Sequence, residues 1–198
     1  DLGEQSGSDL YLNEDQLLMV NFGHYYYAYG DEIVNFDSQP YYGNTDSKAR
    51  IRTWDVSDVA NPQDQTDIEL DGQIQRTRRI GDDLYIVSRF TPRIPGIIGY
   101  PQSQQDLSQN QDLLNDVTVQ ELLPSIRING QDSALVDAGN CLVVDTPNSY
   151  WYGVSITTVT KLNTTTNEYS SRCISGPVDG IHMTESNLYL YAHSYYDF

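Results

Sequence analysis

Histidine is the residue type in this sequence with the clearest potential for metal chemistry, and the chain contains three: His24, His182 and His193. His182 and His193 flank one predicted turn, where facing strands could bring their imidazoles together. A catalytic zinc ion uses three protein ligands, and the spacing of the other residues supplies no third one. We therefore interpret the histidines as partly exposed strand residues and expect no metal site.

Carboxylates are the next candidates for chemistry. Five aspartates gather around one predicted turn and the strand after it: Asp55, Asp58, Asp64, Asp67 and Asp71. Their oxygens suit calcium, but the D-x-[DN]-x-[DN]-G pattern of a calcium-binding loop is absent. Solvated turn carboxylates are the favoured interpretation, and calcium is the one cofactor hypothesis.

Hydrolytic chemistry has little support in the sequence. The segment Gly153-Val154-Ser155-Ile156-Thr157 lacks the second glycine of a nucleophile elbow and has the pattern of a strand. Any two of the 28 acidic residues could form a glycosidase pair, but no spacing selects one. We predict no catalytic residues and keep an extracellular hydrolase with a carboxylate or metal centre as the alternative.

The only basic cluster consists of Arg76, Arg78 and Arg79. It could recognise an anion or a carboxylate. In a strand, however, Arg76 and Arg78 share one face and Arg79 takes the other, so we expect all three to pair with carboxylates of their own sheet.

Tyrosines are the candidate binding residues. Five of the 16 lie in a glycine-rich segment outside the repeated strands: Tyr25, Tyr26, Tyr27, Tyr41 and Tyr42. Loop tyrosines offer rigid contact area with a hydroxyl group and often form recognition surfaces. Binding and structural packing both stay open for this group.

Two cysteines, Cys141 and Cys173, predict one disulfide, with two buried thiols as the alternative. No C-x-x-C pair is present for a local zinc or redox site. A disulfide suits a secreted, periplasmic or cell-surface protein. Since the chain starts at Asp1, we expect its targeting segment to have been removed or to lie upstream.

Composition excludes several classes of function. With 28 acidic and 11 basic residues, the net charge is −17, which disfavours nucleic acids and anionic membrane surfaces. The mean hydropathy is −0.51, and no run of residues is apolar enough to span a bilayer. A chain of 198 residues can bury the core of one folded domain.

An internal repeat predicts the elements that position these residues. Residues 10–20, 77–87 and 181–191 share one register of strand, polar turn and strand. Their turns consist of residues that tolerate tight hairpins. The segments 51–56 and 154–162 alternate like strands and each enters a further turn.

Each of these later turns is followed by an outer strand, expected at residues 66–70 and 168–174. Four-stranded meanders repeated in this way are typical of propeller blades. Two insertions interrupt the period, at about residues 23–49 and 91–129. We expect a short helix around Asp112 to Val117 and a hairpin turn at Asn129-Gly130.

Several motifs occur together from Arg50 onward. They include Trp54-Asp55-Val56-Ser57-Asp58, the run from Ile80 to Val87, and Ser186-Asn187-Leu188-Tyr189-Leu190. With the Cys141 and Cys173 pair, they make the chain similar to secreted bacterial and archaeal proteins with a C-terminal β-propeller domain. The resemblance implies export, a multi-bladed propeller in a longer polypeptide, and no established catalytic residues.

The predicted fold class is all-β: residues 1–198 form an incomplete propeller of two to three blades with long inserted loops. The predicted function is a non-catalytic binding module or surface scaffold whose insertions contact a protein or polysaccharide. We expect no nucleic acid partner and no membrane insertion. The remaining blades or another chain should cover the open strand edges.

Overall fold

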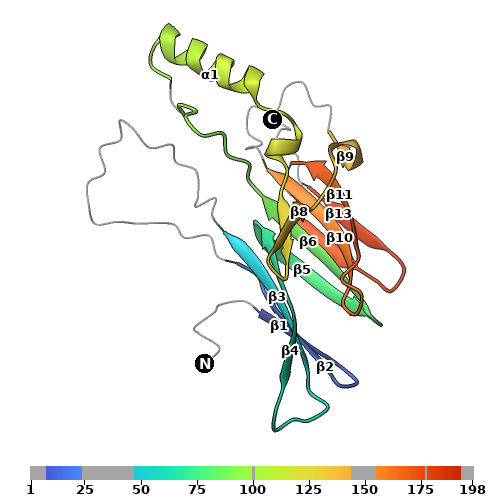
Figure 1. Ribbon diagram of the computed structural model, residues 1–198. Coiled ribbons are helices and arrows are strands. Elements are labelled where there is room, and N and C mark those ends of the chain that lie inside the picture. Colours follow the sequence, from blue (N-terminus) through green and yellow to red (C-terminus); the bar gives the residue numbers. More distant parts are fainter. Residues whose placement is uncertain (1–7, 24–46, 100, 144–154, 177, 193–198) are drawn as a thin grey trace, which may run out of the picture.

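The structure, a computed structural model, describes residues 8–23, 47–99, 101–143, 155–176 and 178–192. Its strands form two large sheets and one separate hairpin (Figure 1). In these ranges, no helix has the length and apolar character needed to cross a membrane.

The first sheet begins with an antiparallel meander, which we call blade 1. Its strands follow the chain in order: β1 (Ser8–Asn13), β2 (Gln16–Asn21), β3 (Lys48–Asp55) and β4 (Gln63–Asp71). The hairpin predicted over residues 10–20 is therefore confirmed as β1 and β2. Its turn places Glu14 at a φ of 51°, a conformation typical of two-residue hairpin turns.

The second sheet contains the next meander, blade 2, in the order β5 (Gln73–Ile80), β6 (Asp83–Phe90), β10 (Ile156–Asn163) and β11 (Tyr169–Ser175). Both predicted outer strands are present, in β4 and β11. The strand β10 pairs with β6 of the hairpin although 65 residues separate Phe90 from Ile156. The predicted blade pattern of hairpin, inner strand and outer strand is therefore confirmed.

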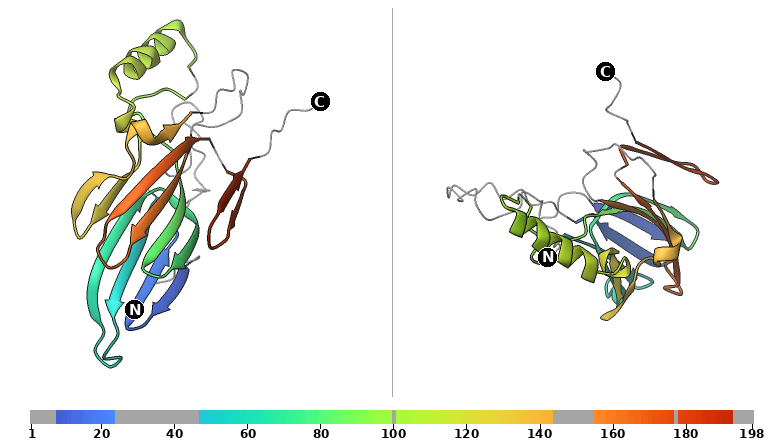
Figure 2. Two further views of the ribbon diagram at one scale, coloured as in Figure 1. Left: turned by 90° about the vertical axis from the view of Figure 1, so that its right-hand side faces the viewer. Right: turned by 90° about the horizontal axis from the view of Figure 1, so that it is seen from above.

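A third hairpin follows blade 2 and consists of β12 (Gly180–Met183) and β13 (Leu188–Tyr191). It corresponds to the last predicted repeat. Figure 2 shows this hairpin apart from the two large sheets. The described chain thus contains two four-stranded blades and the first hairpin of a third, which agrees with the expected two to three blades.

Each hairpin has two faces, because successive side chains of a strand point to opposite sides. In blade 1 the A face carries Leu10, Leu12, Leu17 and Met19. In blade 2 the equivalent face carries Thr77, Arg79, Leu84 and Ile86. In the third hairpin it carries Ile181, Met183, Leu188 and Leu190. The B face is the opposite side. It carries Tyr11 and Leu18 in blade 1, Arg78 and Tyr85 in blade 2, and His182 and Tyr189 in the third hairpin.

The core lies between the B face of blade 1 and the A face of blade 2. Leu18 and Ile51 of blade 1 belong to one buried cluster with Leu84 and Leu162 of blade 2. Burying an aliphatic side chain of this size stabilises a fold by about 1.5–3 kcal/mol. The stacking of one blade on the other therefore supplies the main hydrophobic stabilisation.

The chain between β6 and β10 forms a long insertion. Its described part contains α1 (Gln104–Asp116), η1 (Gln120–Leu122), β7 (Ser125–Ile128), β8 (Gln131–Ala134), η2 (Ala138–Asn140) and β9 (Cys141–Leu142). β7 pairs with β4 of blade 1, and β9 pairs in parallel with β11 of blade 2. The insertion thus extends the outer edges of both blades and continues past the segment expected at 91–129.

Candidate binding surface

The arginine cluster lies on β5, and none of its three members forms an ion pair with a described carboxylate. Arg76 and Arg78 share the B face and Arg79 the A face, as predicted. Arg79 donates to the side chains of Gln16 and Thr164 and to a backbone carbonyl, and Arg78 donates to the carbonyl of Met183. Within the described ranges, no carboxylate forms a salt bridge with any of the three, so the predicted pairing is wrong.

The reason lies in the stacking of the blades. Arg79 points into the interface between the two blades, where Gln16 of β2 accepts its hydrogen bond at 2.6 Å. Desolvation by burial there lowers the pKa of Arg79. Sequence spacing placed the arginines correctly on their two faces but did not show which neighbouring element each face meets.

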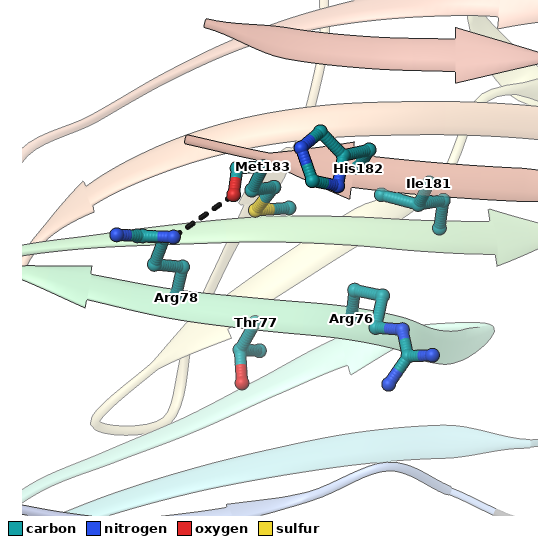
Figure 3. Close-up of a pocket in the computed structure, with 6 residues that line it drawn as sticks. All are labelled: Arg76, Thr77, Arg78, Ile181, His182 and Met183. Carbon is teal, nitrogen blue, oxygen red and sulfur yellow. Dashed lines mark hydrogen bonds between the residues drawn. The ribbon is translucent and has the colours of Figure 1, made fainter. Parts of the chain in front are cut away.

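A small cleft of about 240 Å³ lies between β5 and the third hairpin, lined by Arg76, Thr77, Arg78, Ile181, His182 and Met183. Figure 3 shows the Arg78 guanidinium reaching the Met183 carbonyl, at 2.9 Å, while the side chain of Arg76 points elsewhere. The two cations therefore do not converge on one ligand position. Arg78 instead holds the third hairpin against the B face of blade 2.

The five aspartates proposed for calcium form hydrogen bonds or ion pairs within their own turn or with neighbouring strands. Asp55 accepts the N–H of Ser57, and Asp58 accepts the side-chain amide of Asn61 and the N–H of Ala60; these bonds lower the pKa of both carboxyls. Asp64 and Asp67 lie beside Arg52 and Arg50 on the neighbouring strand, and Asp71 accepts bonds from Ser125. Among the described residues, no group of three His, Cys, Asp or Glu side chains is placed to hold a metal ion.

The insertion presents a more prominent surface. We call residues 94–122 the arm, because Figure 1 shows α1 at one end of the molecule, away from the sheets. Ser103 caps α1 by accepting from the Asp106 N–H, and the Asp106 carboxylate accepts from the Ser103 N–H. This capping box explains why the helix begins earlier and is longer than the segment predicted around residues 112–117.

One side chain holds the arm together internally, and another attaches it to its surroundings. Asn110 both donates to and accepts from the backbone of Ile98, at 2.8 Å each, and so ties α1 to the preceding loop. Gln120 bonds in the same way to the backbone of Val136 and Ala138. The arm is therefore anchored at its base, while α1 itself buries no residue.

The exposed side of α1 is apolar and acidic. Leu107 and Leu114 stand two turns apart on one face and are 48% and 51% exposed. The arm contains no lysine or arginine, and its acidic residues are Asp106, Asp112, Asp116 and Glu121. The exposed leucine pair therefore lies on a helix whose other residues are mostly amides, with three aspartates.

The disulfide predicted from the sequence is present. It joins Cys141 of β9 to Cys173 of β11, with Cα atoms 4.4 Å apart. Cys173 is buried, and Tyr169 of the same strand donates to the carbonyl of Ala134. The outgoing half of the insertion is thus fixed covalently to the outer edge of blade 2.

Other predicted site residues have different outcomes. The tyrosines 25–27, 41 and 42, with His24 and His193, lie outside the described residues. His182 lies on the third hairpin with its ring centroid 6.2 Å from that of Tyr189, which agrees with its interpretation as a strand residue. The sequence located the arm as an insertion with a short helix around residues 112–117, and the Ser103-x-x-Asp106 pattern was the signal that could have revealed where the helix begins.

Comparison with known proteins agrees with this architecture. The sequence model of the family described as "Beta propeller domain" matches residues 1–198, so the chain belongs to the β-propeller domain family. No curated protein and no solved structure matches the chain.

Proposed function

We propose that this chain is an exported, non-catalytic β-propeller module that binds a protein or a polysaccharide at the cell surface through its insertions. The observation that carries this proposal is the arm: an anchored element that holds exposed leucines away from a rigid two-blade scaffold. Binding residues are commonly placed on loops positioned by such a scaffold.

Export is supported by the disulfide, since disulfides persist mainly in oxidising compartments. A binding role is supported by the surface chemistry of α1, where Leu107 and Leu114 offer apolar contact and the neighbouring carboxylates favour basic or hydroxyl-rich partners. The second insertion, residues 23–49, would contribute the tyrosine-rich part of the same role.

Catalysis gains no comparable support. Each described carboxylate with a shifted pKa has that pKa lowered by hydrogen bonds, as Asp106 and Glu121 do. A general acid in a hydrolase needs the opposite shift. The hydrolase alternative therefore has no observation in its favour among the described residues.

The test uses isolated cell envelopes of the source organism as the probe, before and after treatment with protease or with periodate. We expect wild-type protein to bind and a Leu107→Asp, Leu114→Asp variant to bind about tenfold more weakly. Loss of binding after protease indicates a protein partner, and loss after periodate a polysaccharide. The control is Val59→Asp, which adds a charge at an exposed position in the turn between β3 and β4, away from the arm.

Two results would overturn the proposal. One is unchanged binding by the double variant, which would remove the arm from the contact surface. The other is release of sugars or peptides from the envelopes by the wild-type protein, which would demonstrate catalysis.

A further inference from the structure

The turn that joins β10 to β11 carries a sequence motif that the proposed binding role does not use. Residues Asn163-Thr164-Thr165 form an Asn-x-Thr triplet, and no other Asn-x-Ser or Asn-x-Thr triplet occurs in the 198 residues. In exported proteins such a triplet, with any middle residue except proline, is the acceptor sequence for attachment of a glycan to the asparagine amide. Whether that chemistry fits this chain depends on how the turn holds the three residues.

The three residues of the motif have separate roles in the turn. Thr164 is 3% exposed, its hydroxyl lies 2.9 Å from the carbonyl oxygen of Asp82, and its own carbonyl accepts from Gln16 of blade 1 at 3.1 Å. Asn163 is partly exposed at the end of β10, and Thr165 is exposed. The hydroxyl of Thr165 forms no hydrogen bond with any residue that the structure describes. The buried middle residue therefore fixes the turn and leaves the other two at the surface.

The side chain of Asn163 closes an Asx turn. Its Oδ1 accepts the N–H of Thr165 at 3.1 Å and the N–H of Thr166 at 2.8 Å, which brings the amide next to the residue that carries the motif hydroxyl. Its Nδ2 donates one hydrogen bond, to Asp83 at 3.3 Å. The oxygen is thus committed to the turn, whereas the nitrogen, to which a glycan would be attached, has one long hydrogen bond and a second N–H without a described partner.

The turn can keep its hydrogen bonds after such a modification. A glycosylated amide retains its carbonyl oxygen and one N–H, so Oδ1 still accepts from the backbone of Thr165 and Thr166. Asp83 also keeps a partner, because the ammonium of Lys161 lies 2.8 Å from its carboxylate. Open space adjoins the turn, since Thr165 borders a cleft of about 290 Å³. The folded chain therefore accommodates a sugar on Asn163.

We propose that Asn163 is an N-glycosylation site. The donor is an oligosaccharide carried on the phosphate of a membrane lipid. The bond between C1 of its first sugar and the phosphate oxygen breaks, C1 bonds to Nδ2 of Asn163, and the departing phosphate takes up the proton that the amide releases. The inference rests on the export included in the proposed function, because this transfer takes place on exported chains.

The position suits a bulky polar group. β9 pairs with β11 only at Cys173 and Ile174, so residues 169–172 pair with β10 alone among the described strands. Open strand edges promote pairing with other chains. A glycan on the adjoining turn would stand beside this edge and hinder edge-to-edge association of blade 2.

The test analyses the peptide 162–172, which trypsin releases by cleavage after Lys161 and Arg172. Protein is purified from the envelopes or medium of the source organism, and the peptide is sequenced by mass spectrometry with electron-transfer fragmentation, which leaves glycans attached. We expect sugar on Asn163 and none on Asn167. Asn167 is the internal control, because it lies in the same turn but has Tyr169 rather than serine or threonine two positions later.

A matched pair of variants at Thr165 separates the motif from the turn. Thr165→Val removes the hydroxyl at nearly constant shape and should abolish the modification, whereas Thr165→Ser keeps the hydroxyl and should retain it. Both variants keep the Thr165 N–H that Asn163 accepts, and thermal unfolding followed by circular dichroism verifies their folds. Asn163 is left in place, since its replacement would remove the hydrogen bonds of the turn.

Three results overturn the proposal: an unmodified peptide from exported wild-type protein, sugar that maps to a hydroxyl of the peptide instead of Asn163, and modification that persists in Thr165→Val. Each of them leaves the proposed binding role intact, which the arm variant tests separately. An unmodified wild-type chain found only in the cytoplasm, without the Cys141–Cys173 disulfide, would overturn both this proposal and the proposed export.

Discussion

Gly72 joins the outer strand of blade 1, β4, to the first strand of blade 2, β5. Its φ of 93° lies in the region that side chains rarely adopt, and a Cβ there would meet the Arg89 carbonyl group and lie 3.1 Å from the Phe90 Cα. Its N–H also donates to the Ser47 carbonyl at 2.8 Å. The sequence therefore needs glycine at this junction for both backbone conformation and space.

We predict that Gly72→Ala lowers the free energy of unfolding by about 3 kcal/mol, from left-handed strain together with overpacking. Gly81→Ala is the matched control, because Gly81 has a φ of 59° and open space around the added Cβ. It should cost only about 1 kcal/mol. Urea unfolding of both variants measures the difference, and equal losses would exclude the close contact as a cause.

A second residue-scale prediction concerns Asp67 and Arg50, whose Nε lies 2.7 Å from the carboxylate. This hydrogen bond lowers the folded-state pKa of Asp67. A lowered pKa means that the pair stabilises the fold above the unfolded pKa and that this contribution disappears as the pH falls below about 4. Arg50→Gln should therefore flatten the dependence of unfolding free energy on pH in that range.

Arg52→Gln is the control, since its contact with the more exposed Asp64 is longer, at 3.4 Å. Urea titrations from about pH 2.5 to 6 supply the measurement. If wild type and Arg50→Gln show parallel pH curves, the pair does not affect stability.

At the scale of elements, the insertion binds the outer edges of both blades. β7 and β8 extend blade 1, and β9 with its disulfide extends blade 2. Exposed strand edges promote unwanted pairing, and short extra strands are one way to cover them. The insertion therefore protects two edges while it anchors the arm.

Reduction of the disulfide should release β9, a strand of only two residues. Because the two cysteines are 32 positions apart, the loop-closure model gives a loss of about 3.7 kcal/mol in unfolding free energy. Limited proteolysis with mass spectrometry should find new cleavage between Ala138 and Val143. Cys141→Ser should show this cleavage without reductant, and unchanged protection of reduced wild type would contradict the expectation.

At the scale of the whole molecule, the two blades and the further hairpin follow one another in a series in which the B face of one unit contacts the next unit. The sequence predicted that remaining blades or another chain would cover the open edges. In the structure, the contacts between successive units are made by their faces: the Tyr11 hydroxyl bonds to Thr77, and Arg78 donates to the carbonyl of Met183.

The sequence by itself determined the fold class, the three hairpins and the disulfide partners. These features depend on alternation, turn residues and cysteine count, all of which are local or countable. The faces of Arg76, Arg78 and Arg79 also followed, because strand alternation fixes them.

Only the tertiary structure decided what each face meets. Arg79 bonds to Gln16 and Thr164 rather than to a described carboxylate. Blade stacking brings it to Gln16, 63 residues away in blade 1, and strand pairing within blade 2 brings it to Thr164, 85 residues away. β7 and β9 likewise join different blades through long-range pairing. Alternation specifies the two sides of a strand, but the neighbour on each side depends on long-range packing, which local patterns do not encode.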